Sequence, residues 1–407
     1  MAVILTYGFT KFRLFKQGET RYVLVFNIMT QRCIHSAQSP FLPAEAFLNR
    51  GLLPWLRRGA LISGAQPQKD LIVGWGELQR APQAEGPHFF TPDFFLEDSK
   101  PAWVFQHYSV IPQTELSRAL KAQAPDWPPL EWPTLQWKEA RRSGFQKDFA
   151  ILADRFRQGT LAKAVPIISD HAPWPEKPSS EQVKASWVLH ALEYSQSAPV
   201  FLYGAWNGEE GILGATPELL IRQESENRYS TVALAGTRRE AERATRPSLL
   251  DDPKERREHQ LVIDGIEKAL GPFGKIQVGE THELMLPGLS HLKTEISLET
   301  QSRIPLPSLV RALHPTPALG ASPREQGAEI LRLLDRQQAI PRRRFGAPFG
   351  FSSHDSGLAV VAIRNLQWTS REITASAGCG VIAESEESRE WLELRAKLAS
   401  VRRIFGV

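Results

Sequence analysis

The 407-residue sequence contains only two cysteines, Cys33 and Cys379, which lie far apart in the chain. Their spacing matches neither a disulfide framework nor a cysteine metal site, and this scarcity suits a reducing cytoplasm. No stretch approaches the roughly 20 apolar residues that a membrane-spanning helix needs. The first apolar run is interrupted at Lys11, too early for a signal peptide. We therefore expect a soluble cytoplasmic protein that has no membrane partner.

Concentrated charge of one sign is also scarce. The net charge is +4 and the pI about 9.0, yet Lys and Arg are scattered, and the only tight basic cluster is Arg342 to Arg344. We therefore expect no nucleic-acid partner, whereas small anionic substrates fit the basic balance well. A hydrophobic content of 42% with 23% charged residues indicates a globular protein with a substantial core.

The chain divides at a Pro- and Trp-rich connector, residues 124–137. Before it, short β-rich runs such as 21–31 and 71–79 alternate with loops. We place a strand-rich N-terminal region at 1–140, which packs into the same fold, and the catalytic region at 141–407.

The second region mixes helices and strands without regular alternation, which is typical of the α+β class. Apolar residues at helical spacing from Phe145 to Phe156 predict a helix that stops at Gly159. Similar patterns predict helices at 258–270, 306–313, 327–340 and 388–407. Predicted strands cover 198–206, 211–216, 229–236, 357–368 and 371–382.

The C-terminal helix places Glu390, Glu393 and Lys397 on one face, at i, i+3 and i+7. An exposed salt-bridged stripe is the ordinary interpretation of that pattern. However, the segment before it, SAGCGVIAES, carries Gly378 and Gly380, which permit close backbone approach. Backbone N–H groups there could hold an anion while the carboxylates hold a hard cation such as Mg²⁺, which prefers oxygen ligands.

Two further side chains have both a structural and a chemical interpretation. Glu218 in LGATPELL follows a probable strand and could simply counter a helix dipole. Lys163 in GTLAKAVPI has small apolar neighbours and could snorkel to the surface, but a desolvated lysine can also serve as a general base.

Three more motifs allow the same two interpretations. His314 lies in LHPTPALGASPR, a rigid loop that could shape a pocket or merely connect elements. Arg364 in VAIRN interrupts an apolar strand, and a buried guanidinium needs an anion, either a substrate carboxylate or a structural Glu. Glu258 ends the charged run DDPKERRE. Such a run is usually a solvated face, but the buried face of a helix begins here.

The ordered motifs together resemble the chorismate-utilising enzyme family, which includes anthranilate, aminodeoxychorismate, salicylate and isochorismate synthases. In order they are LGATPELL, LAGT, EHQLVIDGI, HLKT, LHPTPALG, FGAPFGF, VAIR, GCGVIAES and EWLELRAKL. The resemblance runs from about residue 145 to the C-terminus and is looser before it. The LHPTPALG form is most similar to isochorismate synthases, whereas Lys163 occupies a place where both isochorismate and salicylate synthases have a lysine. Ala235 before the Gly-Thr argues against aminodeoxychorismate synthases.

This resemblance implies a fold of two large antiparallel sheets packed together, with helices outside and the site in the cleft between the halves. It implies a Mg²⁺-dependent, reversible isomerisation of chorismate to isochorismate, in which water attacks C2 and the C4 hydroxyl leaves. Lys163 is the implied general base and Glu218 the general acid. The implied metal ligands are Glu258, Glu390 and Glu393, and the implied substrate-binding residues are Thr237, His314, Arg364, Gly378, Gly380 and Lys397.

Several alternatives stay open at this stage. A salicylate synthase would also eliminate pyruvate, and an anthranilate or aminodeoxychorismate synthase would use ammonia. An inactive chorismate-binding protein would keep the fold without turnover. For the isomerase we expect a monomer without a glutaminase partner, and the resemblance leaves open whether the product enters menaquinone, siderophore or salicylate synthesis.

Overall fold

The computed structural model describes residues 40–63, 70–82, 84, 86–96, 102–123, 135–176, 179–208, 210–246, 248–354 and 356–407. The predicted strand at 21–31, Cys33 and most of the 124–137 connector lie outside the described residues. None of the helices in these ranges is long and apolar enough to cross a membrane.

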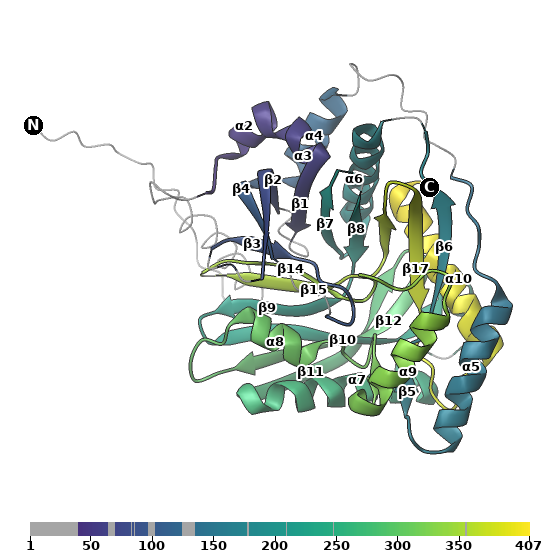
Figure 1. Cartoon of the computed structure of the whole chain (residues 1–407). Helices are drawn as coiled ribbons and strands as arrows, with labels where there is room; N and C mark the ends of the chain where they lie inside the picture. The colour runs from purple at the N-terminus through teal and green to yellow at the C-terminus, as the bar shows by residue number, and fades with distance from the viewer. Residues whose placement is uncertain are drawn as a thin grey trace, which may run out of the picture.

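All described strands except β5 and β13 form one continuous antiparallel sheet of 15 strands that folds back on itself (Figure 1). The first half runs, in hydrogen-bonded order, through β11 (Lys275–Leu286), β12 (Leu289–Glu299), β10 (Arg228–Arg239), β9 (Leu219–Ser225), β15 (Gly357–Val361), β14 (Pro348–Ser352) and β3 (His88–Phe90). The second half continues through β4 (Ala102–Pro112), β2 (Asp70–Ala81), β1 (Arg58–Ser63), β7 (Phe201–Asn207), β8 (Glu210–Thr216), β16 (Asn365–Trp368), β17 (Glu372–Gly378) and β6 (Ile167–Pro173).

The two halves pack face to face through an aromatic core. The ring of Tyr203 on β7 lies 5.0 Å from that of Phe349 on β14, centroid to centroid. Tyr108 on β4 packs 5.9 Å from Phe351 on β14, again centroid to centroid. Because β3 pairs with both β14 and β4, the two predicted sheets are hydrogen-bonded into one. The α+β class and the two packed antiparallel layers are confirmed.

Helices cover the outer faces of both layers (Figure 1). Those of the first part of the chain are α2 (Ala44–Ala46), a π-helix (Phe47–Gly51), α3 (Leu52–Arg57) and α4 (Gln113–Gln123). The others are α5 (Arg142–Arg157), α6 (Ser180–Ser197), α7 (Pro253–Leu270), α8 (Leu306–Leu313), α9 (Arg324–Gln337) and α10 (Glu387–Phe405). A two-stranded sheet of β5 (Lys163–Ala164) and β13 (Ala321–Ser322) lies apart from the large one.

Helix α6 is the clearest element that sequence analysis missed. It is buried on nearly all sides, so it lacks the alternating polar face that marks an amphipathic helix. Its start was readable, because Ser179 accepts a hydrogen bond from the Gln182 backbone N–H in a capping box. By contrast, α5 begins and ends close to its predicted limits, and Gly159 just beyond it adopts a left-handed φ of 67°.

The predicted single strand at 357–368 is wrong. The chain forms β15 and β16 on opposite layers and turns between them at Arg364, which has a φ of 54°. A non-glycine residue rarely adopts this conformation, and unfavourable backbone of this kind gathers at functional sites. Apolar periodicity does not reveal such a break because both flanking segments are buried.

Candidate active site

A pocket of about 520 Å³ receives side chains from both halves of the folded sheet. The β8–β9 turn, β10, α7, β12, the loop after α8, the β15–β16 turn, the end of β17 and α10 all contribute. The lining residues are Pro217, Glu218, Leu234, Ala235, Thr237, Glu258, His291, Ala318, Leu319, Phe345, Ile363, Arg364, Gly378, Gly380 and Lys397.

Lys163 is fully buried and forms an ion pair with Glu258 of α7. Its Nζ donates to Glu258 Oε1 across 2.6 Å. The short strand that carries Lys163 is anchored by paired backbone hydrogen bonds between Ala164 and Val381. Gly380 lies directly beside this pair, and a Cβ at that position would overlap Glu258 Oε1 and Lys163 Nζ. The glycine-rich turn is therefore needed for close packing against the ion pair.

Glu218 ends the turn after β8 and is 3% exposed. Its backbone N–H donates to Thr216 Oγ1 at 3.2 Å, which fixes the turn. Burial raises the pKa of the Glu218 carboxyl to about 8, although the positive charges of Lys397, Lys163 and Arg364 oppose the shift. Glu218 therefore holds its proton at neutral pH, as a general acid must.

Arg364 points into the pocket from the strained turn between β15 and β16. Tyr203 Oη donates to the Ile363 carbonyl at 2.8 Å, and Asn365 Nδ2 donates to the Ala362 carbonyl at 2.6 Å, so both flanks of the turn are held. Within the described residues, no side chain forms a hydrogen bond or ion pair with its guanidinium. A buried guanidinium without a protein counterion favours the substrate-carboxylate interpretation of this residue.

The Ala-Gly-Thr segment forms a bulge in β10. Its register against β12 shifts between Ala235 and Thr237, and Gly236 between them adopts a φ of 73°. The bulge aims the Thr237 N–H at Glu255 Oε2, 2.9 Å away. Thr237 Oγ1 also shares a hydrogen bond of 3.1 Å with His291 Nδ1. Thr237 and His291 both line the pocket.

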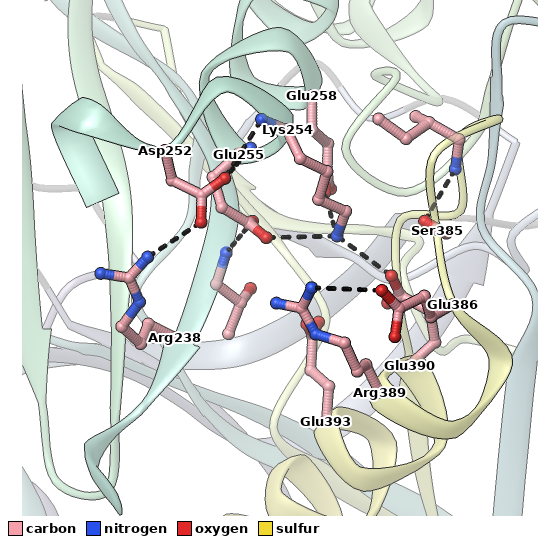
Figure 2. Close-up of polar contacts among 12 residues, drawn as sticks. Arg238, Asp252, Lys254, Glu255, Glu258, Ser385, Glu386, Arg389, Glu390 and Glu393 are labelled. Carbon is pink, nitrogen blue, oxygen red and sulfur yellow. Dashed lines mark hydrogen bonds and ion pairs between the residues drawn. The ribbon is translucent and has the colours of Figure 1, made fainter. Parts of the chain in front are cut away.

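Four glutamates from two helices gather beside the pocket around one ammonium group (Figure 2). Lys254 Nζ lies 3.0 Å from Glu390 Oε1, 3.2 Å from Glu255 Oε1 and 3.8 Å from Glu258 Oε2. A second hollow of about 310 Å³ opens next to it, lined by Thr237, Arg239, Glu242, Lys254, Glu255, Arg389, Glu390 and Glu393.

The predicted common face of the C-terminal helix is confirmed by its contacts. Lys397 Nζ lies 2.6 Å from Glu393 Oε1, one turn away, and donates to the Gly378 carbonyl at 2.8 Å. Glu390 is 2% exposed and belongs to the same buried face. The solvated stripe is therefore excluded for this helix.

The carboxylates differ in how firmly they hold protons. Burial raises the pKa of Glu390 and of Glu255 to about 7, with neighbouring carboxylates adding to the shift and Lys254 opposing it. Burial acts in the same direction on Glu258, but the Lys163 and Lys254 ammonium groups outweigh it and hold its pKa below the ordinary value. The two ammonium groups thus favour the ionised form of Glu258.

The predicted ligands Glu258, Glu390 and Glu393 suit magnesium in donor chemistry. They offer hard oxygen donors at the wall of the pocket, and the Lys254 ammonium between them shows that the cluster accommodates positive charge. Among the described residues, side chains as placed do not form a ready set of three or more metal ligands. Lysines lie between the carboxylates instead.

His314 does not line the pocket, which departs from the expectation for this residue. Its Nε2 donates to the Phe94 carbonyl at 2.5 Å, and burial lowers its pKa to about 4, so the ring is neutral. It anchors the loop from which Leu319 reaches the pocket. Cys379 is also fully buried outside the lining, and burial raises the pKa of its thiol well above the ordinary value. No thiolate is therefore presented to the carboxylates.

Three residues of the site were not predicted from the sequence: Lys254, Glu255 and His291. The first two precede Glu258 by four and three residues on one helix, so they share its face, and this spacing could have identified them. His291 stands in the HLKT motif, and its pKa is lowered well below the ordinary value by burial, with Arg364 adding to the shift.

The chain matches the family described as "Chorismate binding enzyme" over residues 93–406. It is 32% identical over 215 residues to the salicylate biosynthesis isochorismate synthase of Pseudomonas aeruginosa, covering 51% of this chain and 44% of the relative. It is 31% identical over 204 residues to the isochorismate synthase EntC of Escherichia coli, covering 48% and 51%. The matches thus span about half the length of these relatives.

Solved structures share the fold. DhbC of Bacillus anthracis aligns with a TM-score of 0.71 at 20% identity, covering 89% of this chain and 99% of that one. The menaquinone-specific isochorismate synthase MenF of Escherichia coli aligns with a TM-score of 0.68 at 18% identity, covering 87% and 91%. With a family match over most of its length and the same fold, this chain belongs to the chorismate binding enzyme family.

Proposed function

We propose that this protein is an isochorismate synthase, which converts chorismate reversibly to isochorismate. The observation that carries the proposal is a buried protonated carboxyl, Glu218, in the wall of the pocket, together with a buried lysine, Lys163, whose ion-pair partner Glu258 lines the same pocket. Named relatives with this activity, at about 30% identity, support it.

The two groups divide the proton transfers of the isomerisation. Lys163, as the neutral amine, takes a proton from the water that attacks ring C2. Glu218 gives its proton to the departing C4 hydroxyl, which leaves as water while the ring double bond shifts. Each such general acid or base typically contributes about 10²–10⁴-fold to the rate. In the structure the Lys163 ammonium is paired with the Glu258 carboxylate. Lys163 can therefore act as a base only after it has lost its proton and this ion pair is broken.

Substrate binding follows from the remaining polar lining. Chorismate carries two carboxylates, and Arg364 offers a buried guanidinium that no described side chain neutralises. Lys397 adds a second cationic donor to the wall formed by Gly378 and Gly380, and its ammonium also donates to the Gly378 carbonyl. Thr237 completes this wall beside His291. The pocket is thus suited to a small dianion.

We further propose that Glu258, Glu390 and Glu393 hold Mg²⁺. The metal, when bound, supplies positive charge to these carboxylates and to a carboxylate of the substrate. Because the proposed nucleophile is water, no glutaminase partner is required, and we expect a monomer in the cytoplasm.

Product analysis tests the function directly. Purified protein is incubated with chorismate and Mg²⁺, with and without ammonium, and the mixture is separated by HPLC. A mixture of chorismate and isochorismate that ammonium does not change supports the proposal. Salicylate with pyruvate would reassign the protein as a salicylate synthase, and an aminated product would reassign it to the amine-using branch. Bound but unchanged chorismate would indicate an inactive binding protein.

A further inference from the structure

Lys254 lies between carboxylates that the proposed function assigns to the metal. Its Nζ is 3.0 Å from Glu390 Oε1 and 3.8 Å from Glu258 Oε2 (Figure 2). The two glutamates come from helices that meet at this cluster, α10 and α7. A single ammonium therefore bridges both elements at the point where their negative charges converge.

An ammonium and a divalent cation at these oxygens compete for the same negative charge. Mg²⁺ requires ligand oxygens at about 2.0–2.1 Å in a near-octahedral arrangement. The Lys254 ammonium lies against the same two carboxylates, and like charges this close repel strongly in a buried site. We therefore expect a metal ion that binds Glu258 and Glu390 through these oxygens to displace the lysine.

The surroundings of Lys254 allow such a movement. Its side chain is 18% exposed, whereas that of Lys163 is 0% exposed. It lines the second hollow together with Glu242, on the solvent-reachable side of the cluster, and its four-carbon stem is flexible. Glu255 is not among the assigned ligands, and its Oε1 lies 3.2 Å from Lys254 Nζ. Glu255 can therefore remain the ion-pair partner of Lys254 after the lysine moves.

We propose that Lys254 is an internal cation that exchanges with the divalent metal and thereby limits the metal affinity of the site. This inference rests on the magnesium site of the proposed function. Lys254 neutralises the buried carboxylates until the metal takes its place, so its removal strengthens metal binding even though the residue is no metal ligand.

Calorimetric titration of chelator-treated protein with Mg²⁺, without chorismate, tests the exchange. Lys254→Gln is expected to bind Mg²⁺ at least about tenfold more tightly than the unmodified chain, because one competing charge is lost. Lys268→Gln is the matched control, since it removes the same charge from an exposed position on the same helix, and its affinity should not change. In chelator, Lys254→Gln should melt at a lower temperature than the unmodified chain, and added Mg²⁺ should remove this difference.

Two further variants keep the test decisive. Lys254→Arg retains the charge and should bind Mg²⁺ no more tightly than the unmodified chain; a gain equal to that of Lys254→Gln would overturn the exchange. Adding Glu258→Gln to Lys254→Gln should abolish the gain, and its survival would also overturn it. Unchanged or weaker binding by Lys254→Gln would do the same.

The proposed function can fail separately. If the unmodified chain makes isochorismate while Lys254→Gln shows no tighter binding, only the exchange is rejected. If Lys254→Gln binds Mg²⁺ tightly while the unmodified chain makes no isochorismate, the exchange stands and the isomerase assignment is rejected.

Discussion

The two faces of α10 carry buried charges in opposite arrangements. On one face, Arg395 and Arg402 meet the fully buried Asp170 of β6, with shortest distances of 3.0 and 2.7 Å. The Ala140 backbone N–H adds a hydrogen bond of 2.9 Å to the same carboxylate. Glu139 accepts from both arginines at the rim. Every oxygen of Asp170 thus has a protein donor.

On the other face, the charges are only partly matched. Lys254 is shared among several carboxylates, Glu218 carries its own proton, and no described side chain pairs with Arg364. A buried charge that is fully paired by protein groups holds one arrangement of the side chains. A buried charge that is only partly paired can still bind a substrate group or a cation. The comparison separates a structural ion cluster from a candidate catalytic one on the same helix.

The largest expected effect follows from removing Lys163. Lys163→Ala should lower isochorismate formation by about 10²–10⁴-fold, because a buried general base is lost. Far-ultraviolet circular dichroism and product assays on the same sample check that the fold persists. A variant that works at the unmodified rate would eliminate Lys163 as the base.

The ion cluster around Asp170 should affect stability and not activity. Asp170→Asn leaves two arginines without their buried counterion and should cost about 3–5 kcal/mol in the free energy of unfolding. Urea titration measures this loss, and the turnover of the remaining folded protein should stay unchanged. A large loss of turnover at unchanged stability would assign Asp170 to the catalytic site and contradict the distinction between the two faces.

The smallest expected effect is a pH dependence set by Glu218. With a pKa raised to about 8, Glu218 can donate a proton below that pH, so turnover should fall about tenfold per unit above it. Glu218→Gln should be slow throughout and lose this alkaline decline. A decline of the same shape in Glu218→Gln would assign it to another group.

The same group should also affect stability, with a sign that its raised pKa fixes. Because the folded protein binds this proton more tightly than the unfolded chain, the contribution is full below about pH 4.5 and is lost as the pH rises through about 8. Thermal melts of Glu218→Gln against the unmodified chain should therefore favour the variant increasingly across that range.

Much of the candidate site was predictable where residues share one local element. Glu390, Glu393 and Lys397 follow from helical spacing, and Lys254 and Glu255 could have followed from their distance to Glu258. The role of His314 was not predictable, because its partner is a backbone carbonyl at Phe94, 220 residues away in the chain. The turn at Arg364 was hidden for a related reason, since its flanking strands join opposite layers of the sheet.

The sequence by itself determined which side chains share a helix face, where glycines permit close packing, and which family the motifs resemble. Only the tertiary structure decided that Lys254 lies between carboxylates of α7 and α10, that Glu218 keeps its proton, and that Arg364 turns inward. Helical and strand periodicity describes relations within one element. Burial and charge environment, by contrast, arise where segments distant in the chain meet, and these set both the pKa values and the counterions.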